Sequence, residues 1–206
     1  MKKLLMALLL GAALAHGEKV KGTGKSVDVT KFDVRGIKLG MSEKEALKII
    51  KEKFPAGKIE TLELPVDDWE IPIYGKKAIT YQIYVVDKNE KNSEFSLLFV
   101  PNFLGNNPKE LVVSGISYHL PENKDNVKEL RRAAVEKYGQ PVVVDPKHGY
   151  TWCDLAGKKD CAIYEKPFLS VYSLGKRVYL SLSNIEYHEA RNRAQEKAEK
   201  ATKIEL

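Results

Sequence analysis

The order of hydrophobic periodicities along the chain limits the folds that it can adopt. Apolar side chains recur at helical spacing over residues 43–53, and from residue 59 onward the period falls to two, as in half-buried strands. The same change of period occurs again after residue 123. A helix followed by a meander of antiparallel strands, present twice, predicts an α+β protein made of two such units.

The first unit is predicted to cover residues 32–122. Ser42 and Glu45 have the spacing of a capping box, in which each side chain bonds the backbone N–H of the other residue. Pro55 follows the last helical position, so we predict a helix over 43–53. The strands predicted after it are 59–64, 69–74, 78–87, 94–100 and 111–120.

The second unit is predicted to cover residues 123–186. Its helix has an apolar face and ends at Gly139, the residue type that favours the C-terminal cap. The strands predicted after it are 142–145, 150–153, 161–164, 168–173 and 177–184. We interpret the two units as a degenerate tandem repeat. A coincidental order of elements would give the same pattern, because no extended run of identities links the units.

The ends of the chain have a different composition from the middle. Two lysines, an apolar run over 4–14 and small residues ending at Ala15 predict a signal peptide, residues 1–15, cleaved after Ala15. We therefore expect a periplasmic or secreted protein. A membrane anchor is the alternative, but a span needs about 20 apolar residues. No cysteine lies near the cleavage site, so we expect no lipid anchor.

Two further segments flank the predicted units. Residues 16–31 are mostly Gly, Lys, Thr and Ser, which predicts a flexible, extended or disordered leader. Residues 187–206 have opposite charges four apart and a stripe of alanines, which predicts a charged, loosely docked C-terminal helix. No other segment is apolar enough for us to expect a membrane span.

The two cysteines, Cys153 and Cys161, predict a disulfide bond if the protein reaches an oxidising compartment. The alternative is a metal pair together with His148, although that spacing matches no standard zinc pattern. The net charge of +6 comes from lysines scattered among acidic residues, without a basic stripe. We therefore expect no nucleic-acid partner.

Two short motifs suggest cofactors but lack necessary parts. Residues 22–26 resemble the end of a phosphate-binding loop, but Lys19 occupies the position of the first glycine and no strand or helix flanks the segment. His188 begins like a zinc-protease helix, but Asn192 stands where the second histidine is needed. We expect no cofactor and no metal.

The densest group of carboxylates consists of Asp67, Asp68 and Glu70. Paired carboxylates can do acid–base work when their environments push their pKa values apart. This group supports an alternative function, an extracytoplasmic hydrolase. The other interpretation is that these carboxylates belong to a turn and are simply solvated.

Alternation along the predicted strands indicates which side chains face outward. If Ile83 and Val85 point into the core, Gln82 and Tyr84 point away from it. The candidate binding residues obtained in this way are Gln82, Tyr84, Tyr172, Arg177 and Tyr179. Tyrosine and arginine are typical of binding surfaces. Ordinary tyrosine pairing on a solvated sheet face is the other interpretation.

Residues 34–42, Val-Arg-Gly-Ile-Lys-Leu-Gly-Met-Ser, lead into a helix that ends at Phe54-Pro55. This segment resembles the opening of the β-lactamase-inhibitor-protein-like fold, a superfamily that also contains the small outer-membrane assembly lipoproteins. The resemblance implies a helix before a curved antiparallel sheet and a protein-binding role. The second unit matches only at residues 138–141, and the lipidation cysteine of the lipoproteins is missing.

Taken together, these features predict a non-enzymatic protein that binds another extracytoplasmic protein through an exposed sheet face. A hydrolase that uses the carboxylate group is one alternative. A carrier for a small apolar ligand is another, and it requires a cavity.

Overall fold

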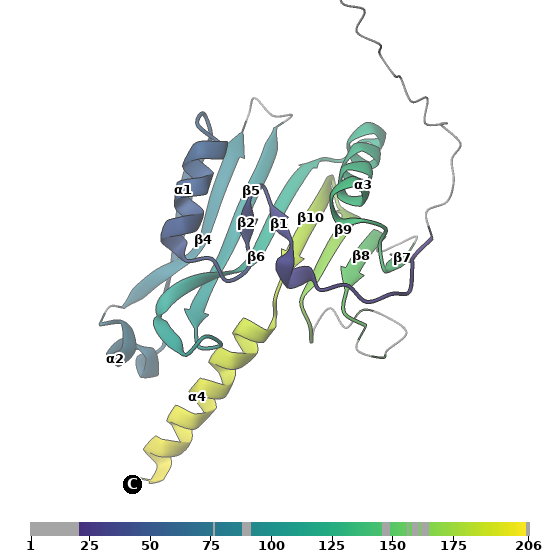
Figure 1. Cartoon of the computed structure of the whole chain (residues 1–206). Helices are drawn as coiled ribbons and strands as arrows, with labels where there is room; N and C mark the ends of the chain where they lie inside the picture. The colour runs from purple at the N-terminus through teal and green to yellow at the C-terminus, as the bar shows by residue number, and fades with distance from the viewer. Residues whose placement is uncertain are drawn as a thin grey trace, which may run out of the picture.

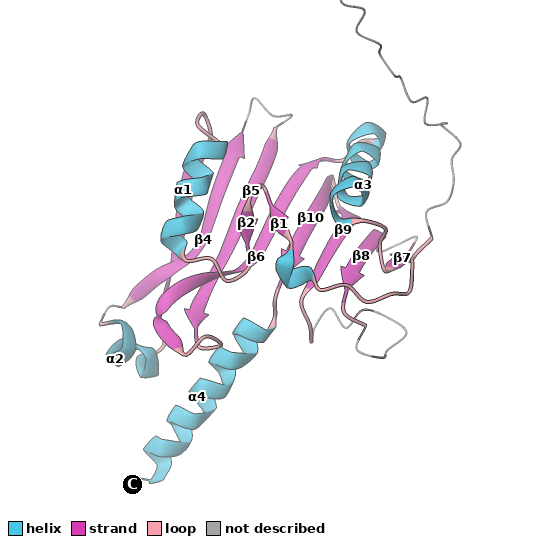
Figure 2. Ribbon diagram, viewed as in Figure 1, coloured by secondary structure: helices cyan, strands magenta, loops and turns pink. Residues whose placement is uncertain are grey.

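The structure is a computed structural model that describes residues 21–75, 77–87, 92–145, 149–155, 157, 161 and 165–204. Within these residues the protein is α+β, as predicted, with four α-helices, an antiparallel sheet of eight strands and a separate two-stranded hairpin. Figure 1 shows the arrangement of the elements, and Figure 2 shows the same view coloured by secondary structure.

The first half begins with a short 3-10 helix, η1, and the hairpin, and then has one long helix and four strands of the sheet. In chain order the elements are η1 (Val29–Lys31), β1 (Asp33–Val34), β2 (Ile37–Lys38), α1 (Glu43–Lys53), β3 (Lys58–Pro65), η2 (Asp68–Glu70), α2 (Ile71–Tyr74), β4 (Ala78–Asp87), β5 (Ser93–Asn102) and β6 (Asn107–Pro121).

The second half repeats the order of one long helix and four strands, and a C-terminal helix follows. Its elements are α3 (Lys124–Tyr138), β7 (Val143–Asp145), β8 (Gly149–Cys153), β9 (Phe168–Leu174), β10 (Arg177–Ser183) and α4 (Glu186–Ile204). Of the predicted strand 161–164, Cys161 lies outside any strand and residues 162–164 lie outside the described part of the chain.

The eight strands have the order β3-β4-β5-β6-β10-β9-β8-β7. The last strand of each half therefore lies at the centre, where β6 and β10 pair in antiparallel register from Arg177 opposite Pro121 to Ser183 opposite Gly115. Each half runs outward from this pair in the same sequence. A duplicated unit would produce this order, and the duplication itself stays a prediction.

Helices α1 and α3 lie on the same face of the sheet, with the β1–β2 hairpin between them (Figure 1). The core lies between this helical layer and the sheet. Phe95, Leu97 and Leu182 from the strands are at most 1% exposed, and Ala46 and Ile50 of α1 are fully buried. Burying one such leucine or phenylalanine side chain stabilises the fold by about 1.5–3 kcal/mol.

The predicted ends of the two long helices are confirmed. The Glu45 N–H donates to the Ser42 hydroxyl, and the Ser42 N–H donates to the Glu45 carboxylate at 3.0 Å, which completes the capping box. Helix α3 ends at Gly139, whose φ of 81° lies in the region that glycine enters without a steric penalty. Local sequence therefore fixes both helices before packing is considered.

The prediction of a strand over 69–74 is wrong. The alternation of large apolar residues favoured a strand, but the chain forms η2 and α2 there. Asp67 and Glu70 make a capping box across the first turn. Pro72 cannot donate a ladder hydrogen bond, whereas the start of a helix accepts proline because its N–H groups have no partner in the helix.

The described part of the leader is extended and attached to the second half. The N–H of Thr23 donates to the Pro141 carbonyl, and the N–H of Val27 donates to the Cys153 carbonyl. Val29 is 1% exposed. Backbone bonds to Pro141 and to the end of β8, together with the burial of one valine, hold a segment whose composition predicted flexibility.

Helix α4 leaves the end of the sheet after β10 and projects from it (Figure 1). Its first turns contact β5 and η2. Beyond Arg191 most of the described side chains are exposed or half-buried. Among the described helices, none is both long and apolar enough to cross a membrane.

The predicted disulfide is present between Cys153, at the end of β8, and Cys161. Cys153 also packs with Val142 and Leu155 in a small cluster beside the main core. Closing a loop this short removes only a little chain entropy from the unfolded state, which corresponds to about 2 kcal/mol.

We expect both cysteines of the purified native protein to react with a thiol label only after reduction. Mass spectrometry of the denatured protein, labelled with and without prior reduction, measures this directly. Labelling of Cys153 in the denatured but unreduced protein would contradict the bond.

Candidate functional site

Alternation along the central strands sends one set of side chains away from the helices. On β10, Val178, Leu180 and Leu182 are buried under the helical layer, and the residues between them are half-buried on the other side. We call this second surface the open face. Its residues come from β4, β5, β6, β9 and β10: Gln82, Tyr84, Glu94, Ser96, Leu98, Ser117, His119, Ser170, Tyr172, Arg177, Tyr179, Ser181 and Ser183.

The strand register brings four of these residues into one row. Glu94 on β5 lies opposite His119 on β6, His119 lies opposite Tyr179 on β10, and Tyr179 lies opposite Tyr172 on β9. Directly opposite residues of antiparallel strands point to the same face. The four side chains therefore form a continuous strip across the middle of the open face.

The three rings of this row stack on one another. The centroids of Tyr172 and Tyr179 are 5.1 Å apart with planes at 9°, and those of His119 and Tyr179 are 5.0 Å apart with planes at 24°. Burial raises the pKa of the Tyr172 hydroxyl, and Tyr179 adds to the effect. Stacking restricts the rotamers of the rings, so this aromatic surface is ordered before any partner arrives.

Charged groups close one end of the stack. Arg177 forms an ion pair with Glu94, and its guanidinium donates to His119 Nδ1 at 3.2 Å. Arginine can only donate, so Nδ1 is an acceptor and the proton of the neutral imidazole is on Nε2. Burial lowers the pKa of His119, Arg177 lowers it further, and Glu94 opposes both.

A shallow groove lined with small residues lies beside the stack. The row next to it consists of Tyr84, Ser96, Ser117, Ser181 and Ser170, each opposite its neighbour on the adjacent strand. The groove is lined by Ser96, Ser117, Ser181 and Ser183, together with Gln82 and Leu98. Hydroxyl groups along its floor can both donate and accept hydrogen bonds.

The structure brings three of the five predicted residues together and separates the other two from them. Tyr172, Arg177 and Tyr179 belong to the stack and its charged end. Tyr84 is 36% exposed and lies on β4, three strands from β10. At a strand spacing of roughly 4.8 Å this places it about 14 Å from Ser181, the β10 residue of its own row, and about 16 Å from Tyr179, two residues further along β10.

The alternation used for the prediction fails at one point on β4. The register with β3 shifts between Gln82 and Thr80, and Thr80, which strict alternation with Gln82 and Tyr84 would place on the open face, is buried. Sequence reasoning also left His119 and Glu94 outside the site. Tyr118 and Leu120 are core residues, so the alternation that found Tyr179 could have placed His119 on the open face. To place Glu94 in the same row, the register of β5 with β6 had to be known.

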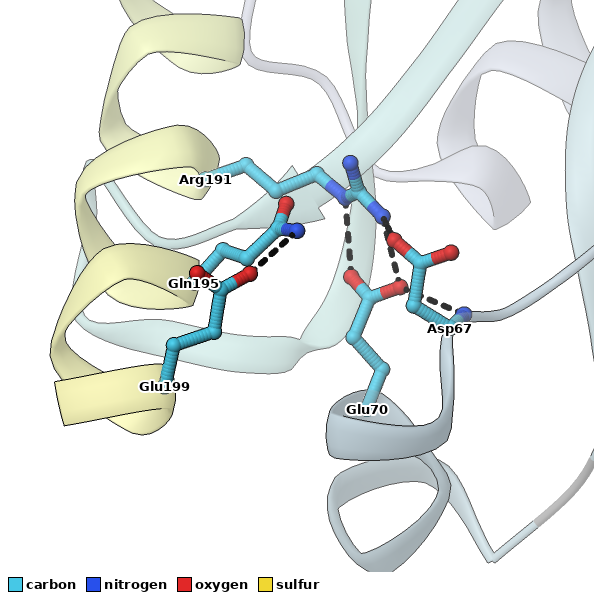
Figure 3. A network of polar contacts seen from close by, with 5 residues as sticks. All are labelled: Asp67, Glu70, Arg191, Gln195 and Glu199. Atoms are coloured by element: carbon cyan, nitrogen blue, oxygen red, sulfur yellow. Dashed lines mark hydrogen bonds and ion pairs between the residues drawn. The ribbon is translucent and has the colours of Figure 1, made fainter. Parts of the chain in front are cut away.

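The carboxylate group proposed for catalysis is tied to α4. Arg191 donates through Nε to one oxygen of Glu70 at 2.9 Å and through Nη2 to the other at 2.8 Å. The same Nη2 donates to Asp67 at 2.7 Å, and Glu70 also accepts from the Asp67 N–H (Figure 3). We call this set of three residues the α4 clamp.

The contacts of the α4 clamp make its carboxylates unsuited to acid–base chemistry. Glu70 is 1% exposed, and both of its oxygens accept hydrogen bonds from a guanidinium. A bidentate arginine stabilises the charged carboxylate and holds it in place. The cluster therefore has the geometry of a structural ion pair that attaches α4 to the β3–β4 connection.

A possible serine–histidine dyad lies near the α4 clamp and is also enclosed. His188 Nε2 lies 3.4 Å from the Ser114 hydroxyl, but Ser114 is 1% exposed. Burial lowers the pKa of His188, and Arg191 adds to this. A serine that substrate cannot reach does not act as a nucleophile, so the pair contributes packing.

The motifs that suggested cofactors have structural explanations or lie outside the described residues. A Cβ at Gly22 would come within 2.5 Å of the Val142 carbonyl oxygen, so glycine allows close packing there. His148 lies outside the described residues. Among the residues that the structure describes, no group of three His, Cys, Asp or Glu side chains could hold a metal ion.

The lowered pKa of His119 predicts how stability depends on pH. The unfolded chain binds a proton at His119 near pH 6.5, whereas the folded chain binds it only at lower pH. The free energy of unfolding should therefore fall as the pH falls from 7.5 to 5.5. Urea unfolding of wild type and His119→Phe at both values tests this. The variant should lose less stability, with a residual loss from His188. Equal losses of stability in wild type and His119→Phe would contradict the lowered pKa of His119.

The α4 clamp predicts a large effect of one substitution. Arg191→Met leaves the buried Glu70 carboxylate without its cation, which should cost about 3–5 kcal/mol in the free energy of unfolding. Arg193→Met changes an exposed arginine on the same helix and should cost less than about 0.5 kcal/mol. Similar values for the two variants would show that the clamp does not hold α4.

Comparison with known proteins identifies no relative: no protein-family model, curated protein or solved structure matches this chain significantly. The resemblance of residues 34–42 to the β-lactamase-inhibitor-protein-like fold therefore stays a prediction, and the geometry of the open face is the basis for assigning a function.

Proposed function

We propose that this protein is a non-enzymatic binding module that holds another protein against its open face. The observation that carries the proposal is the ordered stack of His119, Tyr179 and Tyr172 in the middle of a sheet face, opposite the face that α1 and α3 cover. Aromatic side chains held in one conformation lose little entropy on binding.

The open face is large enough to form the centre of a protein interface. Its five strands span about 19 Å at roughly 4.8 Å spacing, and seven residues of a strand extend about 23 Å. The product is about half of the area of about 800 Å² that each partner buries in a standard complex. A partner of standard size would therefore also contact elements around the open face.

The chemistry of the open face also fits protein binding. Tyr84 stands at the end of the serine row and the stack lies beside that row, so both border the groove, which can receive a side chain or loop of the partner. Arg177 and Glu94 stand at the end of the stack as a charged pair. Aromatic anchors beside small polar residues are typical of surfaces that recognise proteins.

We propose that binding takes place outside the cytoplasm, in the periplasm or in the secreted fraction, with an extracytoplasmic protein as partner. The Cys153–Cys161 disulfide fits an oxidising compartment. The pattern of residues 1–15 supports the same location, although these residues lie outside the described part of the chain. The hydrolase alternative has less support, because Arg191 binds both Asp67 and Glu70.

The partner can be sought by crosslinking the tagged protein in the native cell envelope and identifying what is captured. Tyr179→Ala then tests the face. The tyrosine is only half-buried, so the free energy of unfolding should change far less than for a core residue. Affinity for the captured partner should fall roughly thirtyfold, because a truncated anchor typically costs about 2 kcal/mol or more.

Leu182→Ala is the matched control on the same strand. Leu182 is fully buried, so its truncation should cost about 2–5 kcal/mol of stability and should not weaken binding by the folded fraction. If Tyr179→Ala stays folded and binds at full strength, the open face is not the binding surface. If Tyr179→Ala unfolds as readily as Leu182→Ala, the ring belongs to the core.

A further inference from the structure

The helical layer does not cover its side of the sheet completely. Helix α3 and the β1–β2 hairpin leave a cavity of about 340 Å³ between them, above strands β6 and β10. Small-molecule sites in proteins have volumes from about 300 to 1,000 Å³. This cavity is on the face opposite to the open face, so it is independent of the proposed protein-binding surface.

The floor of the cavity is a part of the core that solvent reaches. Tyr118 and Leu180 are each 7% exposed, whereas Leu182, on the same strand as Leu180, is fully buried. The apolar residues that line the cavity are Val34, Leu120, Leu130, Ala133, Ala134 and Leu180. An apolar ligand would remove this surface from water, which is favourable in proportion to the area covered.

Lys137 provides one cation at the rim. Its ammonium group lies 2.7 Å from the Asp33 carboxylate and 2.9 Å from the Asp33 carbonyl oxygen, which uses two of its three donors. The Tyr138 hydroxyl also donates to that carbonyl, and the N–H of Gly36 donates to the carboxylate. Asp33 therefore holds the rim in place through its Oδ1 and its carbonyl oxygen, each of which accepts two hydrogen bonds.

Arg35 provides the second cation, in an unusual backbone conformation. Its φ is 58°, and it precedes Gly36 in the two-residue turn between β1 and β2. Turns of this kind favour asparagine or glycine at that position, because Cβ lies too close to a backbone carbonyl oxygen at positive φ, a contact that glycine lacks and that asparagine offsets by bonding the backbone. The guanidinium lies 5.0 Å from the ring centre of Tyr118 and 5.8 Å from that of Phe54. The strained turn therefore places a cation at the edge of an apolar cavity.

The donors of these two cations suit an anionic group. One guanidinium can bind two carboxylates at once, as Arg191 does with Glu70 and Asp67. Arg35 can therefore bind a ligand carboxylate in addition to the partner that it has within the protein. Among the residues that line the cavity, the rim carries the cations Arg35 and Lys137 and the carboxylate Glu129.

We propose that this cavity binds a small monocarboxylate with an apolar body. The apolar body would lie on Tyr118, Leu120 and Leu180, and the carboxylate would bind Arg35 and the third donor of Lys137. Donors on one side of an apolar floor would set both the orientation and the charge preference of the ligand.

Decanoate is a suitable probe, because decanol and decyltrimethylammonium have the same apolar chain with a neutral or a cationic head. Each is titrated into the purified folded protein and followed by the amide signals in a two-dimensional NMR spectrum. Decanoate should shift signals from β1, β2 and α3 and bind at least about tenfold more tightly than either of the others. Equal affinity of decanol would overturn the carboxylate assignment, and shifts confined to other elements would overturn the site.

Three substitutions locate the site. Ala133→Trp places a large ring at the cavity, where Ala133 is an exposed residue of α3, and should abolish decanoate binding. Lys128→Trp is the matched control at an exposed position of α3 outside the cavity lining, and should bind as wild type does. Arg35→Asn suits the positive φ but removes the cation, so decanoate should bind about tenfold more weakly while decanol is unaffected.

Wild-type affinity in Ala133→Trp would overturn the proposal, as would an equal loss of binding in Lys128→Trp. Tyr179→Ala changes the open face, whereas Ala133→Trp changes the cavity on the other face of the sheet. The protein-binding proposal and the carboxylate-binding proposal can therefore fail independently.

Discussion

The pairing of β6 with β10 is the interaction on which the rest of the structure depends. Without it the chain would have two four-stranded sheets, each with an unpaired strand at the side where the two now join. The continuous ladder from Arg177 opposite Pro121 to Ser183 opposite Gly115 removes both edges. It also aligns His119 with Tyr179, so the aromatic row of the open face exists only because the two halves pair in this register.

The same pairing determines how the two faces differ. Each half contributes one long helix, and two helices cannot cover the width of eight strands. They bury the central core residues and leave a cavity beside α3 on one face, and neither of them covers the other face. Alternation along β10 then assigns Leu180 to the cavity floor and Tyr179 to the open face, one residue apart. Neighbouring positions on one strand thus belong to two different candidate sites.

The sequence predicted the features that depend on neighbouring residues. The capping box at Ser42, the end of α3 at Gly139 and the disulfide follow from local patterns and are present. The strand predicted over 69–74 failed because periodicity alone cannot distinguish a short helix with proline in its first turn from a strand. The α4 clamp could not be predicted, because Arg191 and Glu70 are 121 residues apart and nothing local links them.

The predicted binding residues show the same limit. Alternation identified Tyr172, Arg177 and Tyr179 correctly as neighbours on one face, because β9 and β10 are joined by a tight turn that fixes their register. It also included Tyr84, whose distance from the others depends on the order of strands across the sheet. Strand order is a property of the whole fold. The sequence alone therefore could not predict that Tyr84 lies apart from the stack.

The α4 clamp makes the first half of the protein depend on helix α4. Glu70 precedes Arg191 by 121 residues, and an uncompensated carboxylate is costly to bury. While α4 is not in place, Glu70 is better solvated than packed, so the β3–β4 connection does not gain its native burial. Helix α4 therefore completes the first half of the protein, and a chain truncated before α4 would leave that end of its sheet unfinished.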